Sequence, residues 1–294
     1  MIRVGACGWQ YMPVRGDKLS AYARLFDCVE VDTTFYHYPS LRTVEGWRRR
    51  VPGGFAFTLK AHRDISHVYG FGLVEQVYRS LEKMQEYYRT LRAELLVLQL
   101  PYRSAPRKEY LARLSGFFEN AAGYGMRLGL EARGPAWKTD KGRLALRELL
   151  SRHGVTHVFD ASYEEPVYYS DIIYSRIYGK GWHTLWVLDD DEVRDVAEKA
   201  RRYSMNGPVM FMGHGIRMYT DALRVKAYLE RGVLLNIYPR PGLEAVKEAL
   251  LEKPVFPATK KQLIIMHGWK VVDISPSKRI RLASLLENIP EKTY

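Results

Sequence analysis

Residues 28–36 read CVEVDTTFY, a short apolar run that ends in acidic side chains and continues into a polar loop. Short, β-rich apolar runs bounded by turn residues are typical of buried strands. The pattern recurs along the chain, each time followed by a longer segment with helical periodicity. Eight such runs can be counted: Ile2 to Ala6, Cys28 to Asp32, Phe55 to Leu59, Leu95 to Leu100, Arg127 to Glu131, Thr156 to Asp160, Ile172 to Tyr178 and Val209 to Gly213.

This alternation predicts an α/β fold, with a parallel sheet and crossover helices. The clearest helix is expected over Leu73 to Leu91, where apolar and aromatic residues form an amphipathic stripe. Eight strands with crossovers close into a (β/α)₈ TIM barrel. An open doubly wound sheet would carry a Gly-rich phosphate-binding motif after its first strand, and the sequence GACGWQY does not match that motif.

The chain is longer than the barrel requires. Residues 1–231 are expected to form the barrel, and residues 232–294 a small C-terminal α+β appendage packed on it. The appendage contains apolar runs at Val233 to Tyr238 and Gln262 to Met266, and helical stretches near Leu243 to Leu251 and Ser277 to Glu287.

The composition of the chain indicates where the protein is found and what kinds of partner it attracts. No stretch of about 18 or more uncharged apolar residues and no signal peptide occurs, so we expect a soluble, cytoplasmic protein without membrane partners. Cys7 and Cys28 lack metal-ligand spacing and are interpreted as core thiols. Only four Asn and five Gln stand against 45 Lys and Arg, which suggests a thermophile. The net charge of +12 would attract nucleic acid, acidic lipid or phosphorylated substrates, and a generally basic proteome is the alternative explanation.

Inward side chains at the carboxyl ends of barrel strands converge on one pocket. Each of the eight expected strand ends delivers a polar or aromatic group. The substrate-binding candidates are Trp9, Glu30, Tyr36, His62, His67, Gln99, Arg133, Trp137, Arg176, Tyr178 and His214. The catalytic candidates are Asp32, Lys60, Glu131 and Asp160.

Each catalytic candidate also has a structural interpretation. Glu131 and Asp160 end adjacent strands and form a carboxylate pair suited to acid/base work, but either could instead orient Arg133 or a backbone amide. Lys60 is a base, a Schiff-base amine, or the ion-pair partner of a buried Glu30. We expect Lys60 and Glu131 to open into one cavity.

The sequence requires no cofactor. A divalent metal remains an alternative, held by His62, His67 and His214 together with Glu131 or Asp160. The four aromatic candidates would stack a base or a sugar, or would simply pack over the barrel mouth.

At these residues the chain resembles the YecE-like family, barrel proteins known mainly as a domain of unknown function. The resemblance implies the fold and the site, but no particular reaction. It runs in order over about residues 1 to 230, on these stretches: Gly5 to Trp9, Val29 to Tyr36, Phe55 to Ala61, Ile65 to His67, Leu98 to Pro101, Leu130 to Arg133 with Trp137, and Ser175 to Gly179. Three departures change the pocket, since the family usually has Asn at Asp32, His at Tyr178, and an Asn pair at Gly213-His214.

The leading functional hypothesis is a nucleic-acid-processing enzyme, a repair glycosylase or nuclease acting on a flipped nucleotide at the barrel mouth. The alternatives are a sugar or sugar-phosphate isomerase or hydrolase, and a non-catalytic nucleic-acid-binding protein. Gln262 to Ile265, followed by Gly268-Trp269, faintly resembles a sliding-clamp binding peptide with an incomplete aromatic pair.

Overall fold

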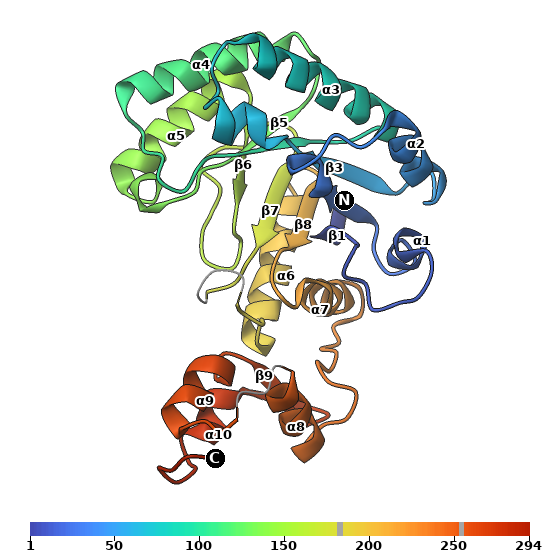
Figure 1. Cartoon of the computed structure of the whole chain (residues 1–294), viewed down its shortest axis with the longest axis vertical. Coiled ribbons are helices and arrows are strands. Elements are labelled where there is room, and N and C mark those ends of the chain that lie inside the picture. Colours follow the sequence, from blue (N-terminus) through green and yellow to red (C-terminus); the bar gives the residue numbers. More distant parts are fainter. Residues whose placement is uncertain (181–184, 253–255) are drawn as a thin grey trace.

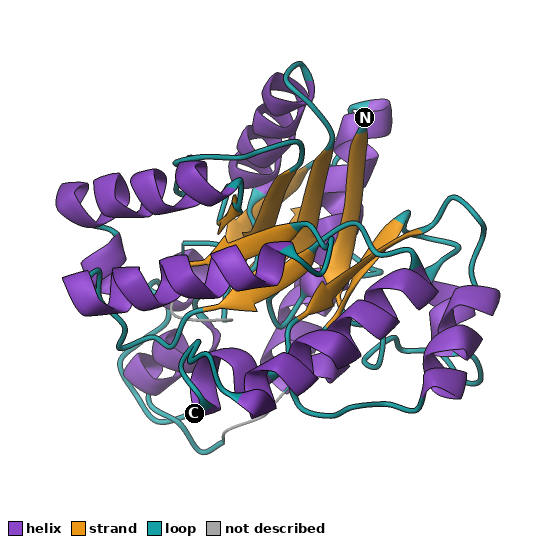
Figure 2. Cartoon of the chain, turned by 90° about the horizontal axis from the view of Figure 1, so that it is seen from above, coloured by secondary structure: helices purple, strands orange, loops and turns teal. Residues whose placement is uncertain are grey.

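The computed structural model describes residues 1–180, 185–252 and 256–294. Eight parallel strands form a closed barrel in chain order, with β8 returning to pair with β1 (Figures 1 and 2). The predicted α/β barrel is therefore confirmed. The strands are β1 (Ile2–Cys7), β2 (Cys28–Val31), β3 (Ala56–Lys60), β4 (Leu96–Gln99), β5 (Leu128–Glu131), β6 (Thr156–Phe159), β7 (Ile173–Ile177) and β8 (Val209–Gly213).

Helices surround the barrel (Figure 2). The expected helix near residues 73–91 is α3, which buries Val77, Leu81 and Met84 as its amphipathic pattern requires. Within the described ranges, no helix has both the length and the hydropathy needed to cross a bilayer. The barrel helices are α1 (Lys18–Tyr22), α2 (Leu41–Arg49), α3 (Glu75–Leu91), α4 (Lys108–Ala122), α5 (Asp140–His153), α6 (Asp190–Ser204) and α7 (Met218–Arg231). Single turns η1 (Thr33–Phe35), η2 (Asp64–Val68) and η3 (Pro135–Trp137) follow β2, β3 and β5.

The connection from β6 to β7 differs from the expected pattern, because residues 160–172 contain no helix. The segment includes Pro166, which has no backbone N–H to continue a helix. It instead runs back along its own strand, where the His157 amide donates to the Tyr168 carbonyl at 2.9 Å. The prediction of a helical crossover after every strand is thus wrong here.

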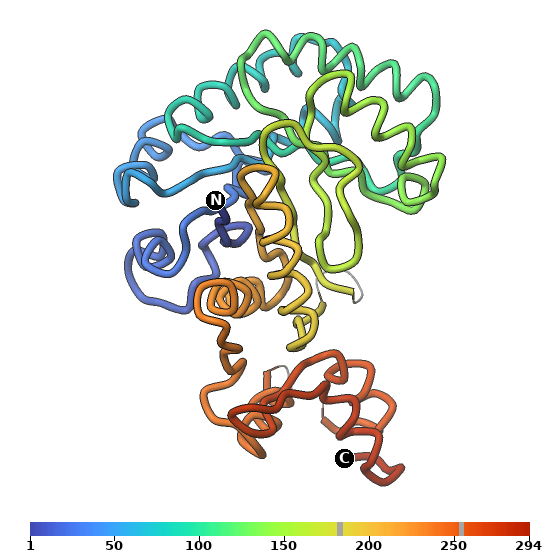
Figure 3. The backbone as a smooth tube through the Cα atoms, turned by 180° about the vertical axis from the view of Figure 1, so that it is seen from behind, coloured from blue at the N-terminus to red at the C-terminus, as the bar shows by residue number. Residues whose placement is uncertain are grey.

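The appendage has a hydrophobic core of its own, separate from that of the barrel. It contains α8 (Leu243–Leu251), α9 (Lys260–His267), the hairpin β9 (Val271–Ser275) and β10 (Lys278–Arg281), and α10 (Leu282–Leu286). In Figures 1 and 3 it lies below the barrel, beyond the extended segment that follows α7.

Two details of the appendage differ from expectation. The helix predicted over residues 277–287 is a strand, β10, followed by the short α10. The apolar run from Gln262 to Met266 lies on α9, where Gln262 forms a capping box with Thr259 and Leu263 is buried in the appendage core. The clamp-like motif therefore begins on a packed helix.

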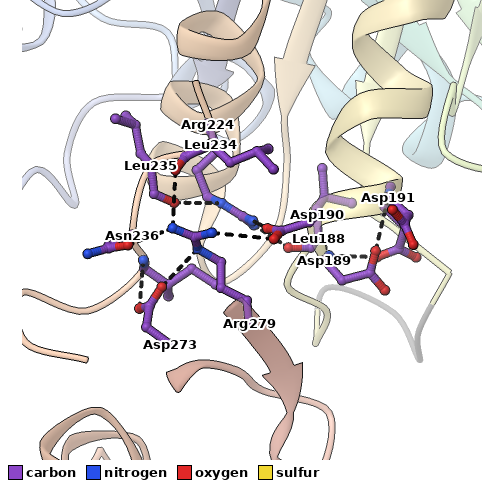
Figure 4. Close-up of polar contacts among 12 residues, drawn as sticks. Leu188, Asp189, Asp190, Asp191, Arg224, Leu234, Leu235, Asn236, Asp273 and Arg279 are labelled. Atoms are coloured by element: carbon purple, nitrogen blue, oxygen red, sulfur yellow. Dashed lines mark hydrogen bonds and ion pairs between the residues drawn. The ribbon is translucent and has the colours of Figure 1, made fainter. Parts of the chain in front are cut away.

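A buried polar cluster joins the appendage to the barrel (Figure 4). The Arg279 guanidinium forms ion pairs with Asp273 of β9 at 2.9 Å and with Asp190 of α6 at 3.3 Å. Asp190 also accepts a 2.5 Å bond from Arg224 of α7. Asp273 accepts hydrogen bonds from the backbone amides of Ile237 and Tyr238, at 2.9 and 2.7 Å. The pair of Arg279 with Asp190 thus links the appendage to the barrel, and each of its two members also pairs with a second charge on its own side.

The segment that leads into α6 contacts both parts of the molecule. Val187 is buried in the appendage core, while Leu185, two residues earlier, lines a cavity of the barrel. Arg281 of the appendage stacks its guanidinium 3.6 Å from the centre of the Trp186 ring and donates to the Val187 carbonyl at 3.2 Å. Asp189 caps α6 in a capping box with Glu192.

Candidate functional site

The alternation of side chains along each strand determines which residues reach the site. Alternate residues of each strand face the barrel interior, where Cys7, Cys28, Ala56, Val97, Val158, Tyr174, Met210 and Met212 pack together. The same alternation, continued to the carboxyl ends of the strands, brings polar groups to the barrel mouth. They are Cys7, Asp32, Lys60, Gln99, Glu131, Asp160, Tyr178 and His214.

Arg176 lies at the centre of this mouth and has no exposed surface. Its guanidinium pairs with Glu30 on one side, with Nε 3.0 Å from Oε2, and with Glu131 on the other, with Nη1 2.6 Å from Oε2. Tyr174 donates a further 2.6 Å bond to Glu30 and is itself 2.8 Å from Thr58 Oγ1. Burial alone would raise the pKa of Glu30, but the Arg176 guanidinium lowers it to about 2. Glu30 is therefore an ionised, fully buried partner of Arg176, and not of Lys60 as the sequence suggested.

A cavity of about 930 Å³ opens over β5, β6 and β7. Its wall combines acidic, basic and tyrosine side chains with backbone. Among the described residues it is lined by Tyr102, Glu131, Ala132, Arg133, Gly134, Lys138, Val158, Phe159, Asp160, Tyr163, Glu164, Tyr178, Gly179, Lys180 and Leu185.

Two of the three carboxylates of this wall, Glu131 and Asp160, accept several hydrogen bonds each. Glu131 accepts from Gln99 at 2.5 Å, from Arg176, and from the Tyr178 hydroxyl at 3.0 Å. Burial raises its pKa and Arg176 lowers it, with a net decrease. Asp160 accepts from the Ser162 amide and hydroxyl at 2.9 and 2.6 Å, and from the Tyr178 amide at 2.9 Å. These bonds fix the loops after β6 and β7, so both carboxylates help to hold the wall of the cavity.

The other side of the mouth, over β8, β1, β2 and β3, has a different character. The Lys60 amine lies 3.8 Å from Asp32 Oδ1 and 4.4 Å from the centre of the Phe35 ring. Asp32 Oδ2 lies 3.7 Å from His214 Nε2. Asp32 Oδ1 and His214 Nε2 are buried atoms without a hydrogen-bond partner among the described residues. Burial raises the pKa of Asp32 to about 7 and lowers that of His214 to about 4.

Tyr178 connects the two sides. Its ring packs against His214 with centroids 4.5 Å apart, and its hydroxyl donates to Glu131. Lys60 is not among the described residues that line the cavity, so the expectation that Lys60 and Glu131 share one cavity is not met. A polar path through Asp32, His214 and Tyr178 lies between them.

The remaining candidates lie at various depths around the mouth. Gln99, Arg133 and Tyr178 contact Glu131 or line the cavity. Two aromatic residues are packing groups, because Trp9 is buried against Trp47 with centroids 5.2 Å apart and Trp137 is buried with its indole N–H on Ser104. Tyr36 is 57% exposed beside Phe35.

The histidines do not converge as the metal alternative required. His62 stacks on Tyr38 with ring centroids 3.8 Å apart and has Nδ1 3.2 Å from Asp64, while His67 contacts Ser66 at 2.8 Å. Neither belongs to the one group of three possible metal ligands found among the described residues, which is Cys7, Asp32 and His214. Sequence analysis missed Cys7, although its place at the carboxyl end of β1, an inward position, was the available signal.

Comparison with known proteins identifies the family to which the chain belongs. Residues 3–241 match the family described as "Protein of unknown function DUF72". A stretch of 126 residues is 29% identical to the UPF0759 protein YunF of Bacillus subtilis, covering 39% of this chain and 45% of that protein. The chain thus matches less than half the length of this curated relative.

Solved structures show the same fold. A DUF72 family protein from Enterococcus faecalis aligns over 78% of this chain and 96% of its own, with a TM-score of 0.65 and 19% identity. One from Thermotoga maritima covers 79% and 100%, with a TM-score of 0.63 and 20% identity. A xylose isomerase domain containing protein from Salmonella typhimurium covers 74% and 94%, with a TM-score of 0.51 and 14% identity. The family match extends over most of the barrel and confirms the resemblance seen in the sequence, so the chain belongs to the DUF72 family.

Proposed function

We propose that the protein is an enzyme that binds a small, hydroxyl-rich anion, such as a sugar phosphate, in the cavity over β5, β6 and β7. The neighbouring group of Lys60, Asp32 and His214 would carry out the reaction, an isomerisation or a hydrolysis. The observation that carries this proposal is the mixed wall of the 930 Å³ cavity. Its volume falls within the roughly 300–1,000 Å³ range of small-molecule sites.

The charges of the wall favour a small anion over a polyanion. Three cationic and three acidic side chains line the cavity: Arg133, Lys138 and Lys180, and Glu131, Asp160 and Glu164. Burial raises the pKa of Asp160 to about 7 and also raises that of Glu164, so the wall becomes more positive as these groups take up protons. Carboxylates and tyrosine hydroxyls can bond sugar hydroxyls, while the cations bind a phosphate.

Nucleic-acid processing, the leading hypothesis from sequence, receives less support from this geometry. A site that follows a nucleic-acid backbone presents successive cations to successive phosphates. Here as many acidic as cationic side chains line the cavity, and the stacking candidates Trp9 and Trp137 are buried in packing contacts. The proposal therefore places a single anionic group in the cavity.

Ligand binding tests the substrate class. Thermal shift and calorimetry should show stabilisation of the purified chain by pentose or hexose phosphates, at concentrations where inorganic phosphate and uncharged sugars act weakly. A ligand at about 100 times its Kd adds roughly 2.7 kcal/mol to the free energy of unfolding. The double variant Lys138→Met/Lys180→Met should bind at least about tenfold more weakly. Lys108→Met, an exposed lysine on α4 outside the cavity wall, serves as the matched control.

The opposite outcome is equally clear. If no small anion binds while an oligonucleotide binds at low salt, the proposal is wrong and the nucleic-acid hypothesis returns. The plot of log affinity against log salt should then have a slope of magnitude above roughly 3, because each neutralised phosphate contributes about 0.7 to 0.9.

Turnover is tested separately on any sugar phosphate that binds. NMR in D₂O would follow loss of the proton next to a carbonyl for isomerisation, and new hydroxyl-bearing products for hydrolysis. Lys60→Met should reduce turnover by about 10²- to 10⁴-fold, the usual contribution of a proton-transferring group, while binding is largely kept. Equal loss of binding and turnover would instead assign Lys60 to substrate binding.

A further inference from the structure

Three possible metal ligands meet at the ends of neighbouring strands. Cys7 ends β1, Asp32 directly follows β2, and His214 directly follows β8. The strand order β8, β1, β2 makes them neighbours, with Ala6 paired to Gly213 and Cys7 to Glu30. One sulfur, one carboxylate oxygen and one imidazole nitrogen of this group all lie within 4.8 Å of one another.

Two atoms of the group lack partners. Asp32 Oδ1 and His214 Nε2 are buried and make no hydrogen bond in the part of the chain that the structure describes. Leaving a buried donor or acceptor unpaired costs about 1–3 kcal/mol per group. The ion-pair distances, 3.8 Å from Asp32 Oδ1 to the Lys60 amine and 3.7 Å from Asp32 Oδ2 to His214 Nε2, lie beyond hydrogen-bonding distance. His214 Nε2 therefore has unused binding capacity beside Asp32 Oδ2, and Asp32 Oδ1 has unused capacity beside the Lys60 amine.

The surrounding charge favours a cation. The charged groups that act on Cys7 and His214 are three carboxylates, Glu30, Asp32 and Glu131, and two cations, Lys60 and Arg176. Carboxylates therefore outnumber cations around the three side chains.

We infer that Cys7, Asp32 and His214 bind a zinc-type divalent metal ion, with a fourth coordination position left open. Tetrahedral zinc with bonds of about 2.0 to 2.2 Å to nitrogen and oxygen places these two ligand atoms roughly 3.3 to 3.6 Å apart. The distance from Asp32 Oδ2 to His214 Nε2 is 3.7 Å, so binding would draw the two side chains slightly together. Thiolate, imidazole and carboxylate together are a donor set that zinc accepts. Three protein ligands plus one open position are typical of catalytic zinc sites.

Neighbouring side chains support the ligands. Asp32 would bind the ion through Oδ2, leaving Oδ1 for the Lys60 amine 3.8 Å away. The Tyr178 ring packs on the His214 imidazole and fixes its plane. Such outer contacts orient ligands and tune their basicity. The side chains of Asp32 and His214 keep 25% and 22% of their surface exposed, so the open position has access to solvent.

The role of the ion in catalysis rests on the proposed function, but metal binding itself does not. In that setting the ion would polarise a substrate oxygen or a bound water molecule beside Lys60.

The test is metal binding by the full chain. Protein stripped with a chelator is titrated with Zn²⁺ by calorimetry and with Co²⁺ by absorption, and the bound metal is counted by elemental analysis. We expect one ion per chain and, with Co²⁺, a thiolate charge-transfer band together with the visible bands of a tetrahedral site. Cys7→Ser should abolish the thiolate band. Cys7→Ser, Asp32→Asn and His214→Gln should each weaken binding by more than roughly 100-fold, above the loss caused by removing outer partners.

The second cysteine provides the control. Cys28→Ala lies deeper in the barrel and outside the ligand group, so it should keep both the stoichiometry and the thiolate band. Circular dichroism and melting of the metal-free variants separate loss of a ligand from loss of the fold. Absence of stoichiometric metal in the folded wild-type chain, or unchanged affinity in Cys7→Ser and His214→Gln, would overturn the inference.

The two proposals fail independently. Metal bound without any affinity for sugar phosphates would contradict the proposed function alone. If instead the chain binds sugar phosphates but takes up no metal ion, only the proposed metal site is contradicted.

Discussion

The two sides of the barrel mouth use the same kind of residue in opposite ways. Asp160, after β6, and Asp32, after β2, occupy equivalent places at strand ends, and burial raises the pKa of each to about 7. Asp160 accepts three hydrogen bonds from the chain. Asp32 has an oxygen with no hydrogen-bond partner among the described residues and faces a histidine nitrogen that also lacks one.

The two aspartates therefore differ in how many hydrogen bonds their buried carboxylates accept. A buried carboxylate with its bonds satisfied holds a structure in place, whereas unsatisfied buried groups are rare in folded proteins and call for an explanation. Sites of function are where such local rules are most often broken. This contrast supports the proposed division of roles, in which the β5–β7 side would bind the substrate and the side over β8, β1, β2 and β3 would carry out the reaction.

The largest expected effect comes from removing Arg176, which pairs with a carboxylate on each side of the barrel mouth. Arg176→Met should lower the free energy of unfolding by about 3–5 kcal/mol, because it leaves Glu30 and Glu131 buried without their cation. Urea unfolding at neutral pH measures the loss. Adding Glu30→Gln and Glu131→Gln to the same chain removes the uncompensated charges and should restore part of the stability. A cost below about 1 kcal/mol for Arg176→Met would contradict the central role of this ion cluster.

The next prediction compares the two aspartates directly. Asp160→Asn should lower the free energy of unfolding by about 1–3 kcal/mol. The NH₂ group of the new amide cannot accept a hydrogen bond and would face the backbone N–H of Ser162 or Tyr178. Asp32→Asn, in metal-free buffer, should cost less than about 0.5 kcal/mol or should stabilise, because Asp32 Oδ1 loses no hydrogen bond to the described residues. If both variants lose the same unfolding free energy, the contrast between Asp160 and Asp32 is contradicted.

The pH dependence of stability sharpens the same comparison. The folded-state pKa of Asp32, about 7, lies above its ordinary value of 3.8. The protonated form is therefore favoured by folding, and its contribution is full below pH 3.8 and is lost as the pH rises through 7. Between about pH 5 and 8, metal-free wild type should lose on the order of 2 kcal/mol relative to Asp32→Asn, with most of the loss below pH 7. Parallel stability curves for the two proteins would show that Asp32 does not titrate in this window.

The smallest effect concerns the residue that joins the two sides. Tyr178→Phe keeps the ring on His214 but removes the hydroxyl that donates to Glu131 at 3.0 Å. We expect a loss of about 0.5–1 kcal/mol in unfolding free energy. The variant Tyr178→His, measured in the same assay, tests the ring contact. A neutral result for Tyr178→Phe would mean that Gln99 and Arg176 alone fix Glu131.

Strand periodicity explains how much could be predicted from the sequence. The barrel and most groups of the mouth follow from the two-residue alternation of side chains, which correctly placed Asp32 and Glu131 at inward strand ends. The partner of Glu30 could not be predicted, because Arg176 reaches it across the barrel from β7. Cys7 was overlooked because cysteine is usually a core residue, and its ligand-like neighbours come from β2 and β8.

Local signals also misled in two places. The turn at Ser275-Pro276-Ser277 opens a hairpin, but the residues after it have a periodicity that also suits a helix. The β6–β7 connection was expected to be helical by analogy with its neighbours, and Pro166 was the signal against it. In both cases tertiary pairing decided between local alternatives.

The segment from Leu185 to Asp189, shared between cavity and appendage, has a consequence for how such proteins diverge. Leu185 lines the cavity, and Val187 lies in the core of the appendage. Recombination that exchanged the appendage for another domain would remove the packing partners of Val187 and the Arg281 contact with Trp186. Trp186 and Val187 directly follow the Leu185 of the cavity wall, so a change in the appendage would alter the packing of the chain right beside the ligand cavity.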